Sequence, residues 1–230
     1  NLPIISNINA INPIGRLSDG RPIFSTAVNA QTRLDPRYNV INQIESLGES
    51  TYRNFTAQLT GRNVYGLQFD LAYTLGKAED NAPITSVLSV QGDAGRTNPE
   101  SLDFDKGPNV LDQRHTFTGS IVARPNVDGG NAFVRGLVNG TIVGVAMQFA
   151  SGVPINLRAN PGEINNDGIN SDRPSGIARN SLNLPARYNT DLRLSRTVPL
   201  GGSRKGEIIA EVKNVFNIVQ WSGVQNAAIA

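Results

Sequence analysis

Oxygen-bearing side chains recur at alternate positions in one polar stretch, a spacing that suits calcium. Glu163, Asn165 and Asp167 precede Gly168 in this pattern. Calcium prefers carboxylate and amide oxygens, and its binding loops place them at alternate positions before a glycine. The candidate calcium ligands are therefore Glu163, Asn165, Asp167, Asn170 and Asp172.

The same stretch departs from the EF-hand pattern at two positions. The first position is Glu163 rather than Asp, and Pro174 stands at the twelfth position, where a bidentate Glu is expected. Short polar side chains also favour turns, because they bond to nearby backbone groups. The alternative to a calcium site is therefore an Asx-rich surface turn.

No other motif predicts catalysis. His115 is the only histidine, and the sequence has no cysteine and no nucleophile elbow. The glycine-rich run 201–206 lacks the Gly-Lys-Ser/Thr order of a phosphate-binding loop. We therefore expect that the protein is not an enzyme, that His115 has a packing or interface role, and that run 201–206 is a hairpin turn.

Charged side chains alternate in sign on two consecutive predicted strands. Asp191 and Arg193 lie on one strand, and Glu211 and Lys213 on the next. Opposite charges on neighbouring strands can pair across a sheet. If this side of the sheet lines a channel, the candidates for the substrate path are Gln58, Gln68, Asp70, Asn189, Asp191, Arg193, Glu211 and Lys213. The alternative is a solvated sheet face without a ligand role.

The elements that carry these residues are predicted strands with one apolar and one polar side. Between Leu67 and Leu75 every second residue is apolar or aromatic. Side chains on a strand point alternately to opposite faces, so this segment has one apolar and one polar face. The same alternation predicts an apolar face formed by Phe55, Leu59, Phe69, Leu71, Phe117, Ile121, Val145, Leu194 and Ile208. Aromatic residues near strand ends, such as Tyr52, Tyr73 and Tyr188, suit membrane interfaces.

Short turns and long polar loops alternate along the chain. The predicted long strands are 51–62, 67–77, 115–124, 137–150, 187–197 and 206–217. Two long loops, 78–113 and 158–186, alternate with shorter connections. This order is typical of bacterial outer-membrane barrels, whose turns are periplasmic and whose loops are extracellular. We therefore predict an all-β fold, an antiparallel up-and-down transmembrane β-barrel segment, with about six membrane strands within 51–217.

One partial β-barrel domain is expected to span residues 1–230. Residues 1–50 are predicted to be mostly extracellular loop with a short strand near 38–45, and residues 218–230 to begin a further loop. The sequence shows no signal peptide, and it opens in a loop-like segment. We expect the chain to be a fragment of a longer protein.

Composition agrees with this interpretation. Apolar residues make up 39% of the 230 residues, and no uninterrupted apolar run reaches the ~18–20 residues of a membrane helix. Any membrane crossing is therefore made by strands. The net charge of +2 is too small to predict nucleic-acid binding. We expect a location in the bacterial outer membrane, with outer-membrane lipid as one partner.

Five segments resemble, in order, the carboxy-terminal barrel of Oar-like TonB-dependent receptors. The segment 189–196 is close to the group's Asn-x-Asp-Leu-Arg-x-Ser-Arg strand. The segment 167–174 resembles its Asp-Gly-x-x-Asn-Asp-Arg-Pro loop, apart from the register of Asn170 and Ser171. The other matching segments are 73–80 (with Gly76 in place of a serine), 112–115, and 211–217 (with Lys213 in place of an aromatic residue).

This resemblance implies a barrel of about 22 strands with an amino-terminal plug, energised through TonB. This sequence shows neither the plug nor a TonB box, and TonB would act through the missing amino-terminal part. The strands would line the lumen, and the loops would help to capture an unidentified extracellular substrate. Two alternatives remain open: a secreted or cell-surface β-domain for adhesion, stabilised by calcium, and a passive porin. No cofactor other than this calcium is expected.

Overall fold

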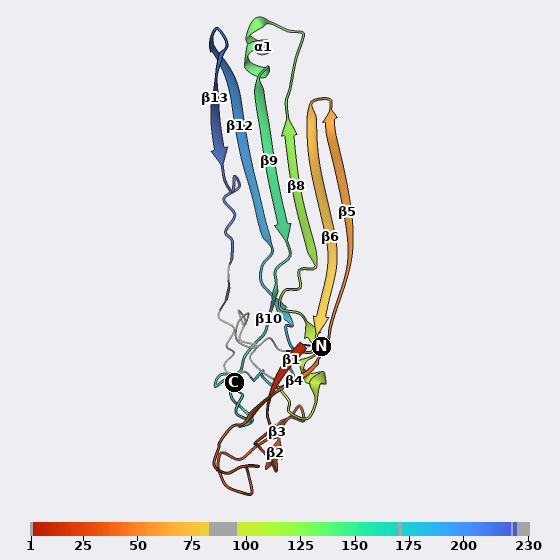
Figure 1. The fold of residues 1–230 in the computed structure, drawn as a ribbon, viewed down its shortest axis with the longest axis vertical. Coiled ribbons are helices and arrows are strands. Elements are labelled where there is room, and N and C mark those ends of the chain that lie inside the picture. The colour runs from red at the N-terminus through yellow and green to blue at the C-terminus, as the bar shows by residue number, and fades with distance from the viewer. Residues whose placement is uncertain (1, 83–95, 170–171, 222, 225–230) are drawn as a thin grey trace.

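The long strands of the protein form one antiparallel sheet (Figure 1). The computed structural model describes residues 2–82, 96–169, 172–221 and 223–224. The long strands are β5 (Ser50–Val64), β6 (Leu67–Asp80), β8 (His115–Ala123), β9 (Thr141–Ala150), β12 (Arg187–Gly201) and β13 (Arg204–Val212). They are neighbours in the order β13-β12-β9-β8-β6-β5, so the sheet has the predicted up-and-down topology.

The sheet is open along two edges. β5 and β13 each pair with one long strand and not with each other. The described strands therefore form a curved wall and not a closed barrel. Each open edge of this wall carries unpaired backbone N–H and C=O groups, which are not tolerated in lipid.

The register gives this wall one apolar and one polar face. Phe69 pairs with Ile121, Ile121 with Val145 and Val145 with Leu192, so these side chains share one face. The residues predicted for the apolar face all lie there, namely Phe55, Leu59, Phe69, Leu71, Phe117, Ile121, Val145, Leu194 and Ile208. Tyr52 is an exception to the predicted aromatic belt, because its ring lies on the polar face against Gly76.

A row of aromatic side chains crosses the apolar face. Tyr73, Phe117, Phe149 and Tyr188 are successive cross-strand partners. The ring centroids of Phe149 and Tyr188 are 4.8 Å apart. From this row an apolar band extends along β12 from Tyr188 to Arg196, which is roughly 27 Å at ~3.4 Å per residue. That length is close to the ~25 Å height of the apolar band of membrane barrels.

The short connections lie at one end of the sheet, called here the turn end (top of Figure 1). Tyr65 and Gly66 join β5 to β6 with positive φ at both residues, as a type I′ hairpin turn requires. The connection from β8 to β9 contains a short helix, α1 (Ala132–Val138), capped at its start by the Asn131 side chain. The predicted strand 137–150 is therefore wrong at its start, because Leu137 and Val138 belong to this helix and β9 begins only at Thr141.

The β12–β13 hairpin also differs from its prediction. The predicted strand ends at residue 197, but β12 continues through Pro199 and Leu200 and the chain turns after Gly201. β13 then ends at Val212 instead of residue 217. Beyond it, Asn214 adopts a positive φ, which interrupts the extended backbone.

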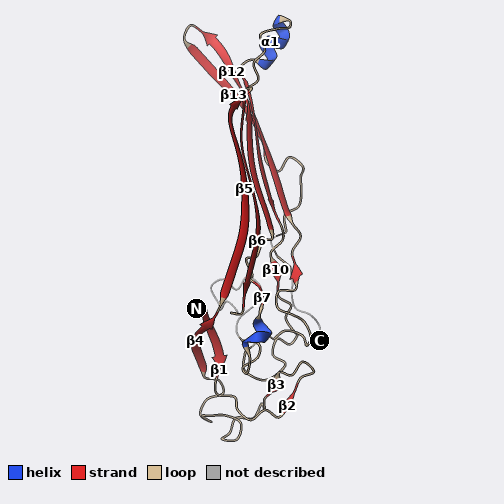
Figure 2. Cartoon of the chain, turned by 90° about the vertical axis from the view of Figure 1, so that its right-hand side faces the viewer, coloured by secondary structure: helices blue, strands red, loops and turns tan. Residues whose placement is uncertain are grey.

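The long connections gather at the opposite end in a loop cap, defined as the described residues of 2–49, 96–114 and 151–186 (Figures 1 and 2). It contains β1 (Leu2–Asn7), β2 (Gly15–Arg16), β3 (Pro22–Ile23), β4 (Asn42–Gly48), the 3₁₀ helix η1 (Leu102–Asp105), β7 (Gly107–Pro108), β10 (Pro154–Ile155) and β11 (Leu182–Asn183). β1 pairs with β4, β2 with β3, and β10 with β11. The predicted loop over residues 1–50 therefore contains two small sheets, and the short strand expected near 38–45 is β4.

The loop cap holds most of the buried side chains of the described protein. Its buried apolar residues include Ile4, Phe24 and Ile155, but buried arginine, asparagine and aspartate residues outnumber them. Buried polar groups need hydrogen-bond partners, so this end is ordered largely by polar contacts. Within the described residues, no helix is long and apolar enough to cross a membrane.

Candidate functional site

The polar face of the sheet carries the candidate substrate-path residues. The register places on this face Gln58, Gln68, Asp70, Asn189, Asp191, Arg193 and Glu211. Lys213 follows β13 directly and reaches the same side, because its Nζ lies 3.4 Å from an Asp191 carboxylate oxygen. Strand alternation thus brings all eight predicted residues to one side.

Five of these residues, Asn189, Asp191, Arg193, Glu211 and Lys213, form a polar and charged cluster on β12, β13 and the residue that follows β13. Arg193 Nη1 lies 2.8 Å from Glu211 Oε1, and Asn189 donates a hydrogen bond of 3.0 Å to Asp191. The Asp191 carboxylate also accepts the backbone N–H of Asn214 at 2.9 Å. The Arg193 and Glu211 side chains are 51% and 44% exposed, so they remain available to a solute. The predicted cross-strand pairing is therefore present in the structure.

The remaining candidates form a second group on β5 and β6. Gln58 donates to Asp70 at 3.0 Å, and Arg124 donates to Gln68 at 2.8 Å. β8 and β9 separate this group from the polar and charged cluster. The structure therefore brings the predicted residues onto one face but in two groups.

The surface between the two groups is lined by polar residues that the sequence analysis did not single out. Thr118 and Gln148 are cross-strand partners on β8 and β9, and Gln148 pairs in turn with Asn189. They border a shallow hollow of about 460 Å³ that Arg187 also lines. The alternation along β8 and β9 was the signal that could have identified Thr118 and Gln148. Together these side chains make the polar face continuous from β5 to β13.

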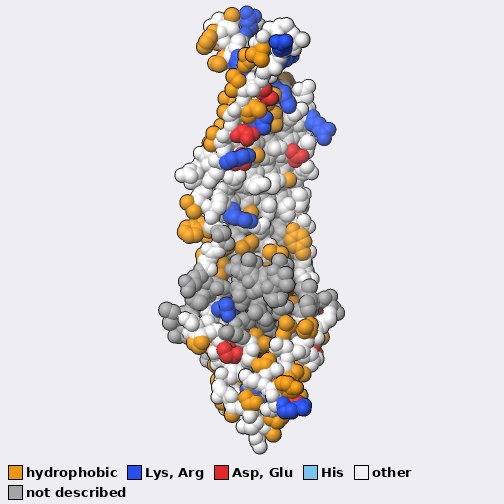
Figure 3. Space-filling model, turned by 60° about the vertical axis from the view of Figure 1, so that its left-hand side comes forward, with side chains coloured by type: hydrophobic (Ala, Val, Ile, Leu, Met, Phe, Trp, Pro, Cys, Tyr) orange, Lys and Arg blue, Asp and Glu red, His pale blue; other side chains and the backbone are white. Residues whose placement is uncertain are grey.

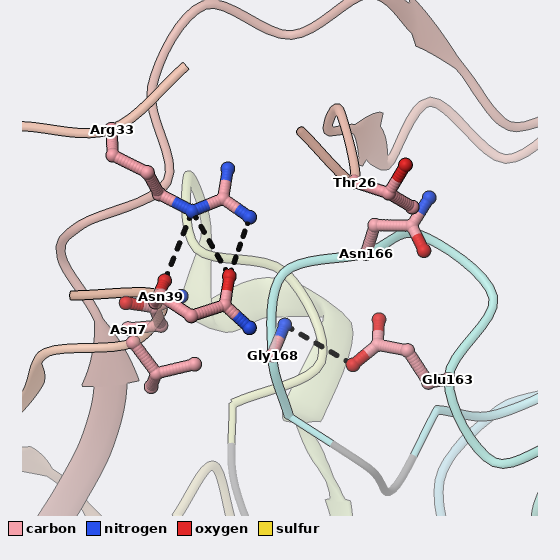
Figure 4. A pocket seen from close by; sticks show the side chains of 8 residues that line it. Asn7, Thr26, Arg33, Asn39, Glu163, Asn166 and Gly168 are labelled. Carbon is pink, nitrogen blue, oxygen red and sulfur yellow. Dashed lines mark hydrogen bonds between the residues drawn. The ribbon is translucent and has the colours of Figure 1, made fainter. Parts of the chain in front are cut away.

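A second candidate site is a pocket of about 220 Å³ in the loop cap (Figure 4). It lies between the first 40 residues of the chain and the segment around Gly168, and six of its eight lining residues have polar side chains. The lining residues are Asn7, Thr26, Arg33, Asn39, Val40, Glu163, Asn166 and Gly168. Of these, the sequence analysis identified only Glu163 as a candidate for chemistry.

Arg33 and Glu163 stand on opposite sides of this pocket in Figure 4. Arg33 is buried, and its guanidinium donates to Asn39 Oδ1 at 2.8 Å and to backbone oxygens of Ser25 and Thr32. No carboxylate of the described residues forms a salt bridge with it. The pocket therefore presents a cation on one wall and a carboxylate on the other.

The predicted calcium ligands are engaged by backbone N–H groups. Glu163 accepts the N–H groups of Asp167 and Gly168 at 3.1 Å each, and Asp167 Oδ1 accepts that of Ile169 at 2.7 Å. Asp172 accepts the N–H of Ile164 at 2.8 Å. These are the bonds of an Asx-rich turn.

Burial shifts the pKa of these acids upward. Burial is the main cause that raises the pKa of Asp167 to about 8, and the nearby carboxylates of Asp172 and Glu163 contribute to this increase. Burial also raises the pKa of Glu163 and of Asp172. Asn170 lies outside the described residues, and within them no three His, Cys, Asp or Glu side chains are placed to share a metal ion. Calcium binding remains a prediction.

Buried ion pairs join the separate loops of the cap. Arg21 lies 3.1 Å from Asp172, and Arg173 lies 3.0 Å from Asp105. Arg179 pairs with Asp80 where β6 enters the cap. The sequence analysis missed these contacts as structural features, although the Asp-Arg pair at 172 and 173 belongs to one of the motifs that carry the family resemblance.

His115 lies on the apolar face, where its Nδ1 is 2.7 Å from the hydroxyl oxygen of Tyr73. Their rings are stacked with centroids 6.1 Å apart. This position beside the aromatic row fits the packing or interface role expected from the sequence.

The chain matches the model of a family described as outer membrane beta barrel domain, over residues 1–178. This range covers four of the long strands, β5, β6, β8 and β9, and most of the loop cap. No curated protein and no solved structure is similar enough to match the chain.

Proposed function

The chain belongs to the outer-membrane β-barrel domain family and is located in the bacterial outer membrane, and on this basis we propose that it forms part of the barrel of an Oar-like TonB-dependent receptor. In this proposal the strands line the lumen of a transporter. The loop cap contributes to the capture of an extracellular substrate.

The observation that carries the proposal is the separation of the two faces across all six long strands. The apolar face, with its aromatic row, suits contact with lipid. The opposite face carries polar side chains on every long strand from β5 to β13, including the exposed Arg193–Glu211 pair, although Val122, Ile142 and Ile209 also lie on it toward the turn end. In a barrel this second face lines a hydrated interior, through which a polar substrate can pass.

The receptor assignment is supported by the five motifs that resemble the Oar-like group. Asp172 and Arg173 of the loop motif tie three loops together through Arg21 and Asp105. An ordered cap held by buried ion pairs suits a binding surface better than a set of independent loops would. TonB would engage an amino-terminal part of the longer protein.

The chemistry of the cap pocket suggests a hydrated substrate. Its volume of about 220 Å³ accommodates a sugar or a short polar group, but not a whole macromolecule. Arg33 and Glu163 offer hydrogen bonds and charges of both signs. We propose that a glycan, a peptide or a metal chelate presents one polar moiety to this pocket. No catalytic step and no nucleic-acid partner is part of this proposal.

The test is energy-dependent uptake by cells that make the full-length protein. Glycan, peptide and metal-chelate libraries would first be screened for compounds that raise the thermal stability of the purified protein. A compound found in this way should bind less well to Glu163→Gln but normally to Glu45→Gln, a cap variant outside the pocket. Its uptake should stop when TonB is deleted, whereas binding should persist. Uptake that continues without TonB would identify a passive porin and overturn the receptor proposal.

A further inference from the structure

Helix α1 is attached to the apolar side of the sheet at the turn end. Thr141 and Arg196 are cross-strand partners in register with the apolar face. Both bind the last turn of the helix: the Thr141 hydroxyl donates to the carbonyl of Leu137 at 2.9 Å and Arg196 Nη1 donates to it at 2.5 Å. Arg196 Nη2 also donates to the carbonyl of Gly136. Figure 2 shows α1 level with the tip of the β12–β13 hairpin, with the hairpin leaning to the left and α1 lying to the right.

The apolar side chains of α1 have no covering element among the described residues. Phe133 is 77% exposed and Leu137 59% exposed, and Val134 is also exposed. Phe133 and Leu137 are one helical turn apart and Val134 is adjacent, so the three share one side of the helix. A helix of seven residues is too short to be stable by itself in water. Its apolar side therefore needs an apolar environment.

The position of α1 relative to the apolar band indicates which environment that is. Arg196, which holds the helix together with Thr141, is the first charged side chain that β12 places on the apolar face beyond the aromatic row, and Val198 continues this face toward the hairpin. The helix is thus held where the first charge interrupts the apolar face, which is where such a surface would meet lipid headgroups in a membrane.

The charges around α1 complement an anionic surface. The turn-end segments 62–66, 124–140 and 196–207 contain six Lys or Arg residues and two Asp or Glu residues. Figure 3 shows basic and hydrophobic side chains intermingled at this end of the molecule. Lysine and arginine beside an apolar helix face are typical of helices that bind in the headgroup region of a membrane.

We propose that α1 is an interfacial anchor that inserts Phe133, Val134 and Leu137 into the phospholipid leaflet on the turn side of the outer membrane. In a barrel of this family the turn side is periplasmic. The surrounding basic side chains contact lipid phosphates. The anchor fixes the depth of the barrel in the membrane. It depends on the outer-membrane location alone and not on the receptor function proposed above.

The test measures the depth of spin labels on two sides of the helix. Val134→Cys, Leu137→Cys and Arg135→Cys variants of the full-length protein would each carry a nitroxide. Residue 135 is the matched control, because it points away from the apolar side of the same helix. The proteins would be reconstituted in vesicles of phosphatidylethanolamine and phosphatidylglycerol. A heat-dependent mobility shift would show that each variant is folded.

We expect the labels at 134 and 137 to be more accessible to oxygen, which partitions into lipid, than to a water-soluble nickel chelate. The label at 135 should show the reverse preference. Equal access of the nickel chelate to all three labels would place the helix in water and overturn the proposal. Protection of the labels at 134 and 137 from both reagents would show that protein covers this face, which would also overturn it.

Discussion

The buried pair of Arg173 and Asp105 should control whether the loop cap stays closed. Arg173 is 3% exposed and Asp105 is fully buried, and their charged atoms are 3.0 Å apart. Arg173 also donates to the carbonyl of Phe104, and Asp105 accepts the N–H of Thr97 at 2.9 Å. The substitution Arg173→Met would remove the cation and leave the carboxylate buried.

The expected cost follows from the burial of both partners. Removing one member of a buried ion pair destabilises a protein by roughly 3–5 kcal/mol, because the remaining charge has no partner. Each 1.4 kcal/mol changes an equilibrium constant about tenfold. If the loss is confined to opening of the cap, its open population should rise roughly a hundredfold to a few thousandfold. Asp105→Asn in the same protein should recover part of the loss.

Hydrogen exchange of the full-length protein would measure this opening. The amides of residues 96–112 should exchange about a hundredfold faster, or more, in Arg173→Met. The matched control is Arg16→Met in the same cap. Its pair with Glu100 is 54% and 46% exposed, so exchange should change by less than about fivefold. Equal acceleration by the two substitutions would refute the argument that burial gives the Arg173 pair its importance.

Three further predictions concern the acids, the glycines and the lumen. The pKa of Asp167 is about 8 in the folded cap and ordinarily near 4, so the cap binds a proton that the opened loop releases. Base catalysis accelerates amide exchange as pH rises in any protein, so the quantity to compare is the protection of the cap relative to that intrinsic rate. The free energy of cap opening obtained from this protection should fall as pH rises from about 5 to 8, by up to ~1.4 kcal/mol per pH unit, and Asp167→Asn should flatten this dependence. Gly152→Ala would place a Cβ 1.6 Å from the Leu184 carbonyl oxygen and should lower the amount of folded protein on a heat-modifiability gel, whereas Gly129→Ala has open space and should not. Arg193→Gln breaks an exposed pair and should change the stability by less than ~1 kcal/mol in a denaturant titration; a larger loss would mean that the pair is structural.

The strands could be predicted from the sequence because their signal is local. Alternation along β6 and β12 assigned residues such as Phe69 and Leu194 to one face. Once one residue of a strand is assigned to the correct face, alternation assigns all the other residues of that strand. Helix α1 was missed because Ala132–Val138 contains valines and a glycine, which are poor helix formers. The hydrogen bonds from Arg196, 59 and 60 residues away, help to hold it.

The loop cap was the least predictable part because its contacts join residues that lie far apart in the sequence. Arg21 and Asp172 are 151 residues apart, and no local pattern relates them. The spacing of the acids around Asp167 predicted a calcium site. The same spacing also fits a turn in which backbone N–H groups donate hydrogen bonds to the carboxylates, and the structure shows these bonds. Arg33 offered no signal, because its burial depends on contacts with Asn39 and Ser25 that only the folded cap creates.

The central claim is that one face of the sheet meets lipid and the other meets water. Single cysteines at 191, 192, 193 and 194 of β12, in the full-length protein in outer membranes, would test it with a charged, membrane-impermeant thiol reagent. We predict labelling at 191 and 193 and protection at 192 and 194, because consecutive side chains on a strand alternate between faces. Uniform labelling, or labelling at 192 and 194 instead, would contradict the account.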